Sequence, residues 1–258
     1  YEIHERLVGS EMCIRDRVTD MPNELILICS VVFIYGAALL GYKFFGKTGL
    51  YCISVIATIL ANIEVTIMIN AFGMEQTLGN VLFAVTFLIT DILSECEGKK
   101  AAQTAVYAGI FCSIFFLVLS QSWMLYTPSA TDTIMPSIKA VFSNTPRMIL
   151  ASLVVYAVSQ MFDVWLYHKW WNFTEKKFGN KRRFLWLRNN GSTLISQILN
   201  TALFTAFAFW GTYDIPTLIS IFISSYVIYI FTSLLDTPFV YIARKIHDKK
   251  LNAKAEKA

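Results

Sequence analysis

The sequence predicts an all-α polytopic membrane protein, a bundle of six to seven transmembrane helices. Of its 258 residues 55% are hydrophobic and only 16% are charged, and the mean hydropathy is +0.52. Soluble domains carry about 25% charged residues. The apolar residues also gather in long continuous stretches, without the alternation typical of membrane barrel strands. Because a lipid-embedded backbone must satisfy its own hydrogen bonds, such stretches predict helices.

Seven apolar segments are candidates for these helices. A helix needs about 20 residues to cross about 30 Å of hydrocarbon, and most of the segments meet that length. The third is shorter and ends in charged residues, so its inner boundary is open. A short interfacial helix is expected from Ile134 to Phe142, in the long connection before the fifth segment. The segments cover residues 25–45, 50–72, 78–95, 102–126, 147–168, 192–211 and 216–241.

The distribution of Lys and Arg predicts the orientation. With seven crossings, one side of the membrane carries only Lys139 and Arg147. The other side carries Lys43, Lys47, Lys99, Lys100, Lys169, Lys176, Lys177, Lys181, Arg182, Arg183, Arg188, Arg244, Lys245, Lys249, Lys250, Lys254 and Lys257. Since basic loops stay in the cytoplasm, we expect a cytoplasmic C-terminus and an outside N-terminus.

The chain is expected to hold one transmembrane domain, residues 21–247, followed by a charged cytoplasmic tail, residues 248–258. Residues 1–20 are expected to lie outside this fold. Their first seventeen residues, YEIHERLVGSEMCIRDR, look like a translated sequencing adapter, and the native start is expected at Met21. This stretch lacks the apolar core of a signal peptide.

The composition also excludes several classes of function. The five cysteines and three histidines show no metal-binding spacing, so neither a metal site, a disulfide nor a cofactor is expected. The net charge of +4 comes mostly from residues that flank the spans, which argues against a nucleic-acid partner. The sequence has no Ser/His/Asp set, no paired Asp in a G-x-G-D context and no His-rich spacing inside the spans. An intramembrane enzyme is therefore disfavoured.

A short polar cassette appears twice inside the apolar segments, as SQMFD at 159–163 and SQILN at 196–200. Polar side chains in hydrocarbon are unfavourable, so they usually face a cavity or a partner. Counting 1.5 Å per residue from the inner ends of the fifth and sixth spans places Gln197 level with Asp163. The two copies thus run antiparallel and predict one polar layer in the inner half of the bilayer.

The third and seventh spans add carboxylates at a similar depth. Asp91 and Glu95 are four residues apart and share a helix face, and Asp236 lies in the last span. Like charges at that spacing repel each other. We therefore expect a basic partner, with Lys99 or Lys100 as candidates for Glu95, or a bound proton.

Several of these motifs, in this order, resemble the queuosine precursor transporter family of the vitamin uptake transporter group. The resemblance covers about residues 22–247. The matching stretches are ANIEV (61–65), TFLITDILSECEGKKAA (86–102), ASLVVYAVSQMFDV (151–164), WLRNNGSTLISQILNT (186–201) and LLDTPFVYIARK (234–245). The family usually ends the second cassette in Asp, whereas this chain has Asn200. That difference removes a charge and makes the two copies unequal.

The resemblance implies a carrier in the cell (inner) membrane that imports purine-like bases, 7-cyano- and 7-aminomethyl-7-deazaguanine, by alternating access. The candidate contacts are side chains that can accept hydrogen bonds from a guanine-like edge, or that can both donate to it and accept from it. These are Asn62, Glu64, Asp91, Gln160, Asp163, Gln197 and Asn200. A gate or pairing group is expected from Arg188, Asn189, Asn190, Glu95 and Asp236.

A second interpretation is the substrate-binding subunit of an energy-coupling-factor vitamin importer. Such a subunit needs a docking surface of small residues on its first span, where Ala37 and Ala38 offer weak support. Co-purification with ATPase subunits would decide between the two. The expected partners are otherwise the lipid bilayer and the small-molecule substrate, and the general habits of such carriers suggest a homodimer.

Overall fold

The structure is a computed structural model that describes residues 22–142, 146–179 and 184–256. The N-terminal extension expected at 1–20 lies outside these residues, as do Lys181, Arg182 and Arg183 in the connection after the fifth span. The elements in chain order are α2 (Asn23–Phe45), α3 (Lys47–Glu64), β1 (Met68–Ala71), β2 (Met74–Thr77), α4 (Gly79–Cys96), α5 (Lys99–Trp123), α6 (Met135–Phe142), α7 (Pro146–Phe178), α8 (Leu185–Phe209) and α9 (Ile215–Ala255).

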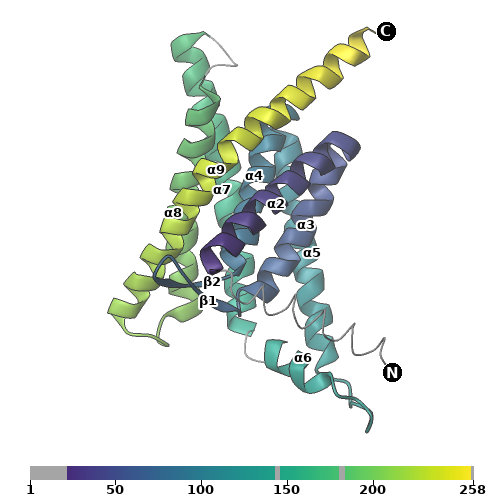
Figure 1. The fold of residues 1–258 in the computed structure, drawn as a ribbon, viewed down its shortest axis with the longest axis vertical. Coiled ribbons are helices and arrows are strands. Elements are labelled where there is room, and N and C mark those ends of the chain that lie inside the picture. Colours follow the sequence, from purple (N-terminus) through teal and green to yellow (C-terminus); the bar gives the residue numbers. More distant parts are fainter. Residues whose placement is uncertain (1–21, 143–145, 180–183, 257–258) are drawn as a thin grey trace, which may run out of the picture.

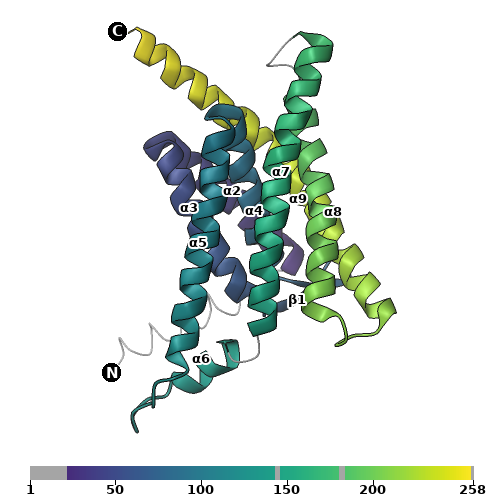
Figure 2. The same ribbon diagram turned by 180° about the vertical axis from the view of Figure 1, so that it is seen from behind.

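The described helices confirm the predicted all-α membrane bundle. Six of them, α2, α4, α5, α7, α8 and α9, are long and apolar enough to cross a membrane. The seventh long helix, α3, has 18 residues and so reaches about 27 Å at 1.5 Å per residue. It runs beside α2 and α5, and consecutive long helices alternate in direction (Figures 1 and 2).

Helix α4 lies at the centre of the bundle. It packs against α3, α9, α5, α2 and α7, and most of its side chains are buried, among them Leu88, Ile89 and Ile92. On the periphery, Phe33 is 75% exposed and Phe111 is 70% exposed. A bundle that buries polar groups and exposes large apolar ones fits a lipid surround.

The second apolar segment, 50–72, was expected to form one helix, but the structure divides it. Helix α3 ends at Glu64, and the chain then forms an antiparallel hairpin in which Ala71 pairs with Met74 and Met68 with Thr77. The two turn residues, Phe72 and Gly73, have φ angles of 54° and 71°. Positive φ at both central residues is the geometry of a two-residue hairpin turn. The segment is apolar enough for either structure, and this turn decides for the hairpin.

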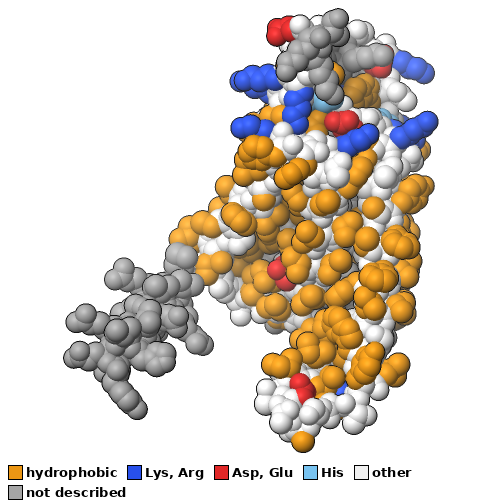
Figure 3. Space-filling model, turned by 90° about the vertical axis from the view of Figure 1, so that its right-hand side faces the viewer, with side chains coloured by type: hydrophobic (Ala, Val, Ile, Leu, Met, Phe, Trp, Pro, Cys, Tyr) orange, Lys and Arg blue, Asp and Glu red, His pale blue; other side chains and the backbone are white. Residues whose placement is uncertain are grey.

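The two ends of the bundle differ in charge. The hairpin and the predicted short helix, found as α6, lie at one end, and the C-terminus lies at the other (Figure 1). Most blue side chains in Figure 3 gather at the C-terminal end. The positive-inside rule assigns that end to the cytoplasm. We call it the inner end, and the end with the hairpin and α6 the outer end.

Candidate functional site

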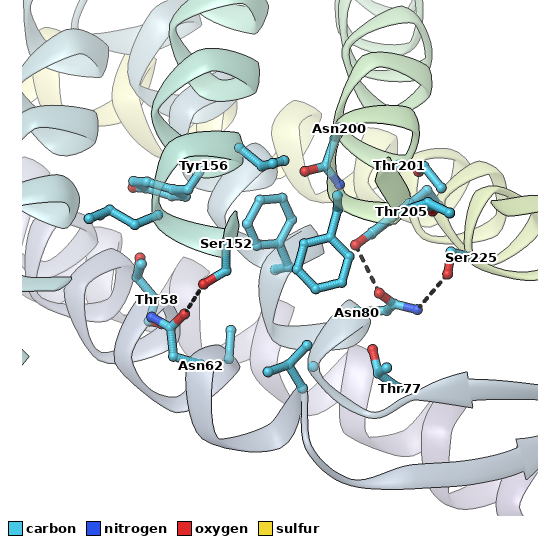
Figure 4. A pocket seen from close by; sticks show the side chains of 18 of the residues that line it. Thr58, Asn62, Thr77, Asn80, Ser152, Tyr156, Asn200, Thr201, Thr205 and Ser225 are labelled. Atoms are coloured by element: carbon cyan, nitrogen blue, oxygen red, sulfur yellow. Dashed lines mark hydrogen bonds between the residues drawn. The ribbon is translucent and has the colours of Figure 1, made fainter. Parts of the chain in front are cut away.

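A cavity of about 50 Å³ lies in the outer half of the bundle, enclosed by α3, α4, α5, α7, α8 and α9 (Figure 4). Space of this size holds a few water molecules, at about 10–15 Å³ each. None of the residues that line it is charged. Its polar lining consists of Thr58, Asn62, Thr77, Asn80, Ser113, Ser152, Tyr156, Asn200, Thr201, Thr205, Ser225 and Tyr229.

Asn62 enters this cavity from the last turn of α3. Its Nδ2 donates to the carbonyl of Thr58 at 2.9 Å, and the hydroxyl of Ser152 donates to its Oδ1 at 2.5 Å. The second bond joins α3 to α7 and fixes the orientation of the amide. An amide has two donor hydrogens and two acceptor lone pairs, so Asn62 keeps capacity to bind a solute.

Asn80 enters from the first turn of α4 on the opposite side. The hydroxyl of Tyr229 donates to Asn80 Oδ1 at 3.0 Å, and Asn80 Nδ2 donates to Ser225 Oγ at 3.5 Å. These contacts join α4 to α9. As with Asn62, hydrogen bonds to another helix hold the amide, and they do not use all of its donors and acceptors.

Aromatic rings form part of the cavity wall. The Phe83 ring lies 6.0 Å from that of Tyr156, edge to face, and 6.4 Å from that of Tyr229. Tyr156 also packs directly on Gly109 of α5, where a Cβ would overlap the tyrosine hydroxyl. Glycine at that position lets the ring approach α5. The cavity therefore combines flat apolar walls with amide groups.

The two cassettes meet on the inner side of this cavity, where α7 packs against α8. Ser159 Oγ donates to Asn200 Oδ1 at 3.3 Å, and Asn200 Nδ2 donates to Gln197 Oε1 at 3.1 Å. Gln160 faces α4, where its Nε2 donates to Thr86 Oγ1 at 2.5 Å. The antiparallel pairing predicted for the cassettes is present, and Asn200 is the member that reaches the cavity.

Two carboxylates lie deeper in the inner half, and both are fully buried. Thr193 Oγ1 donates to Asp91 Oδ2 at 2.9 Å. Ser192 and Ser196 lie beside Asp163. Neither Asp163 oxygen has a hydrogen-bond partner of normal geometry within the described residues. Buried polar atoms are almost always bonded, so Asp163 holds unused binding capacity.

The inner end of the layer is an ion-pair cluster around Glu95. Arg188 Nη2 donates to both Glu95 oxygens, at 2.9 and 2.7 Å, and Tyr167 adds a bond of 2.7 Å. Arg244 Nη1 lies 3.4 Å from Glu95 Oε1, and the Arg188 guanidinium stacks over Trp171 at 4.4 Å. The basic partner expected for Glu95 is thus an arginine far along the chain rather than a neighbouring lysine.

The asparagines next to Arg188 pair with α9. Asn189 Nδ2 donates to Asp236 Oδ1 at 2.5 Å, and Asn190 Nδ2 donates to Thr237 Oγ1 at 2.7 Å. The residues grouped by sequence as a gate thus connect α4, α8 and α9. In the described part of the chain, no group of three or more His, Cys, Asp and Glu side chains is arranged to hold a metal ion.

The predicted contacts fall into three places. Asn62 and Asn200 line the cavity. Glu64 was expected near the middle of the membrane, but it ends α3 at the outer end, half-buried and outside the lining, because the helix is shorter than expected. The remaining predicted contacts lie inward of the cavity and do not line it: Asp91, Gln160, Asp163 and Gln197.

Sequence reasoning missed the α4 and α9 sides of the cavity. Asn80 and Phe83 come three residues apart at the start of an apolar segment, a spacing that places them on one helix face. That pattern was a usable signal. Tyr229 carried none, because its contact with Asn80 spans 149 positions.

Two comparisons with known proteins bear on this bundle. The family model described as "Putative vitamin uptake transporter" matches residues 77–243, from the end of β2 into α9. A protein of Bacillus subtilis (strain 168) named "Probable queuosine precursor transporter" is 35% identical over 226 residues, covering 88% of this chain and 96% of that protein. The chain belongs to this transporter family. No solved structure matches the transporter.

Family membership and the six apolar helices together make this a multi-pass membrane transporter. The match to residues 77–243 includes the α4, α7, α8 and α9 parts of the cavity but not α3. The match to the Bacillus protein extends over almost its whole length.

Proposed function

We propose that this transporter imports queuosine precursors, 7-cyano- and 7-aminomethyl-7-deazaguanine, across the inner membrane, and that it has no enzymatic activity. The observation that carries the proposal is the uncharged cavity with amides on two sides and aromatic walls. The similarity to the Bacillus protein points to the same class of solute.

The cavity chemistry supports a flat, guanine-like solute. Its ring edge carries both donors and acceptors, and the amides of Asn62, Asn80 and Asn200 offer both. Its faces are apolar and aromatic, which suits contact with rings such as Phe83. Ligand sites commonly combine mostly apolar walls with a few polar groups that fix orientation.

We propose that transport proceeds by alternating access around this cavity. The cavity lies in the outer half, and the cluster of Glu95, Arg188 and Tyr167 lies between it and the cytoplasm. In this proposal the cluster is the inner gate, together with Asn189, Asn190 and Asp236. Carriers of this kind bind their solute near the middle of the bilayer and open to one side at a time.

The deeper predicted contacts then belong to the inward part of the path. Asp91, Gln160, Asp163 and Gln197 lie between the cavity and the proposed gate. We propose that they receive the solute once the gate opens. The buried Asp163 carboxylate supports this role, because a carboxylate accepts hydrogen bonds from the N–H groups of a guanine-like edge.

The experiment is uptake of labelled 7-cyano-7-deazaguanine by cells that cannot make it. We expect Asn62→Ala to lower uptake by about tenfold, since a lost hydrogen bond in a dry site is worth about 1–1.5 kcal/mol. Asn172→Ala makes the same chemical change at an exposed position of α7 and should leave uptake unchanged. Surface expression is measured for both.

Two results would overturn the proposal. One is wild-type uptake of riboflavin or biotin with no uptake of the deazaguanine base. The other is normal uptake of the base by a well-expressed Asn62→Ala, Asn200→Ala double variant.

A further inference from the structure

A second, wider cavity of about 380 Å³ opens at the outer end of the bundle. It lies between the β1–β2 hairpin and the outer parts of α8 and α9. Its lining has no charged residue and combines apolar side chains with hydroxyl groups, such as those of Thr66, Tyr213, Thr217 and Ser220, and the amide of Gln76. A polar but uncharged space of this kind suits a neutral polar solute.

The outer cavity adjoins the central one. Val65, Thr77 and Ser225 line both cavities, so these three residues form the neck between them. Ser225 also receives the Asn80 hydrogen bond of the central cavity. The outer cavity is therefore the neighbouring space on the outer side of the central one.

Gln76 is the unusual residue of this outer cavity. It lies on β2 opposite Ile69, and β2 packs against α9. Its side chain is only 3% exposed, yet neither Nε2 nor Oε1 has a hydrogen-bond partner among the residues the structure describes. Buried amides are almost always bonded to protein or ordered water. Gln76 also lines the outer cavity, so its amide keeps its donors and its acceptor for a group that reaches it from there.

We propose that the outer cavity is a second binding site for the transported solute, in which the Gln76 amide binds a neutral heterocycle before it crosses the neck. The proposal rests on the function proposed above and adds an outer site to it. A glutamine amide presents one acceptor and two donors side by side. It therefore matches a lactam or amidine edge, where a ring N–H stands next to an acceptor.

Thiol protection tests the outer site without altering Gln76. In a parent with all five cysteines replaced by Ser, Ser220→Cys places a thiol at an exposed position of the outer cavity. A membrane-impermeant maleimide is applied to whole cells, with and without 7-cyano-7-deazaguanine. At ten times the dissociation constant we expect labelling to slow by about tenfold, by mass action. Ser129→Cys, on the outer loop before α6, is the matched control and should stay unprotected.

Two further backgrounds separate the two cavities. Adding Asn62→Ala and Asn200→Ala disables the central cavity, and protection of Ser220→Cys should remain. Adding Gln76→Ala instead should abolish protection. If the base protects Ser220→Cys only while the central cavity is intact, or if protection survives Gln76→Ala, the outer site does not exist as proposed.

The outcome also separates this inference from the proposed function. Uptake of the base by the cysteine-free parent, with no protection of Ser220→Cys, overturns the outer site and leaves the transport function standing. Absence of uptake by a well-expressed wild type, together with absence of protection in a well-expressed Ser220→Cys variant, overturns both.

Discussion

The outer and inner halves of this bundle both bury polar side chains, but they use them differently. In the outer half, neutral amides and hydroxyls surround a cavity and hold one another across it, as Ser152 does with Asn62. In the inner half, Glu95 and Arg188 are buried against each other. Polar side chains within this bundle thus either line a cavity or close a contact between helices.

The comparison assigns the largest stability effect to the inner half. Arg188→Met leaves Glu95 buried without its main partner, and breaking a buried ion pair costs about 3–5 kcal/mol. For a protein of this size that corresponds to a fall in Tm of about 10 °C. Thermal unfolding of the purified transporter in detergent measures it. Arg244→Met removes a longer contact at a more exposed side chain, 16% against 0%, and should shift Tm far less.

A double variant makes the same prediction sharper. Arg188→Met combined with Glu95→Leu replaces the pair with apolar groups, which is often neutral for stability. We expect Tm to recover while cells expressing the double variant leak the imported base. Recovery of Tm with wild-type retention of the base would show that the pair is structural and not a gate.

The outer half should instead be sensitive to charge. Asn80→Asp keeps the shape of the side chain but places a carboxylate in a cavity with no charged lining. A carboxylate cannot donate, so an acceptor of the bound solute loses its partner, and an unpaired buried group costs about 1–3 kcal/mol, or roughly 5- to 150-fold in affinity. Uptake of the neutral cyano base should fall by that order, while Asn172→Asp on the exposed face of α7 changes nothing. Uptake within twofold of wild type would contradict the neutral character assigned to the cavity.

Asp163, a carboxylate of the inner half, should behave in yet another way. Asp163 is buried beside Asp91, Ser192 and Ser196 but makes no hydrogen bond of normal geometry within the described residues, and Asp163→Asn keeps the size of the side chain while replacing one acceptor oxygen. We expect Tm to stay near that of wild type and uptake to fall by about tenfold, because bonds from a solute to a charged acceptor are worth about 1.5–3 kcal/mol. Asp214→Asn, at an exposed position before α9, is the control. A clear fall in Tm together with the fall in uptake would assign Asp163 a structural role.

The sequence alone predicted the outer shape of this molecule well. Long apolar stretches and the Lys/Arg distribution predict the helices and their alternation, because lipid imposes both on a chain. Repeated polar residues at matched depth also predict that α7 and α8 face each other, and Asn200 with Ser159 confirms it. Periodicity and depth are local properties, so one chain carries them in full.

The contacts between helices were less predictable, because they join positions that are far apart in the sequence. Arg188 and Glu95 are 93 residues apart, and nothing local distinguishes this arginine from the other basic residues near span ends. The hairpin was missed for a different reason. The residues up to Phe72 are apolar enough to continue a helix, and β2, with Glu75, Gln76 and Thr77, lies beyond the segment that was expected to be helical.

The smallest expected effect concerns the aromatic wall of the central cavity. Phe83→Leu keeps an apolar side chain but removes the ring contacts with Tyr156 and Tyr229. A contact between an aromatic ring and a flat solute is worth about 0.5–1.5 kcal/mol, so losing it at Phe83 should raise the half-saturating concentration for uptake by about three- to tenfold with the maximal rate unchanged. Phe111→Leu makes the same change on a ring that is 70% exposed at the periphery and should leave both constants as they are. Equal effects of the two substitutions would mean that Phe83 acts through general packing, and the outer half would lose its aromatic contribution to solute binding.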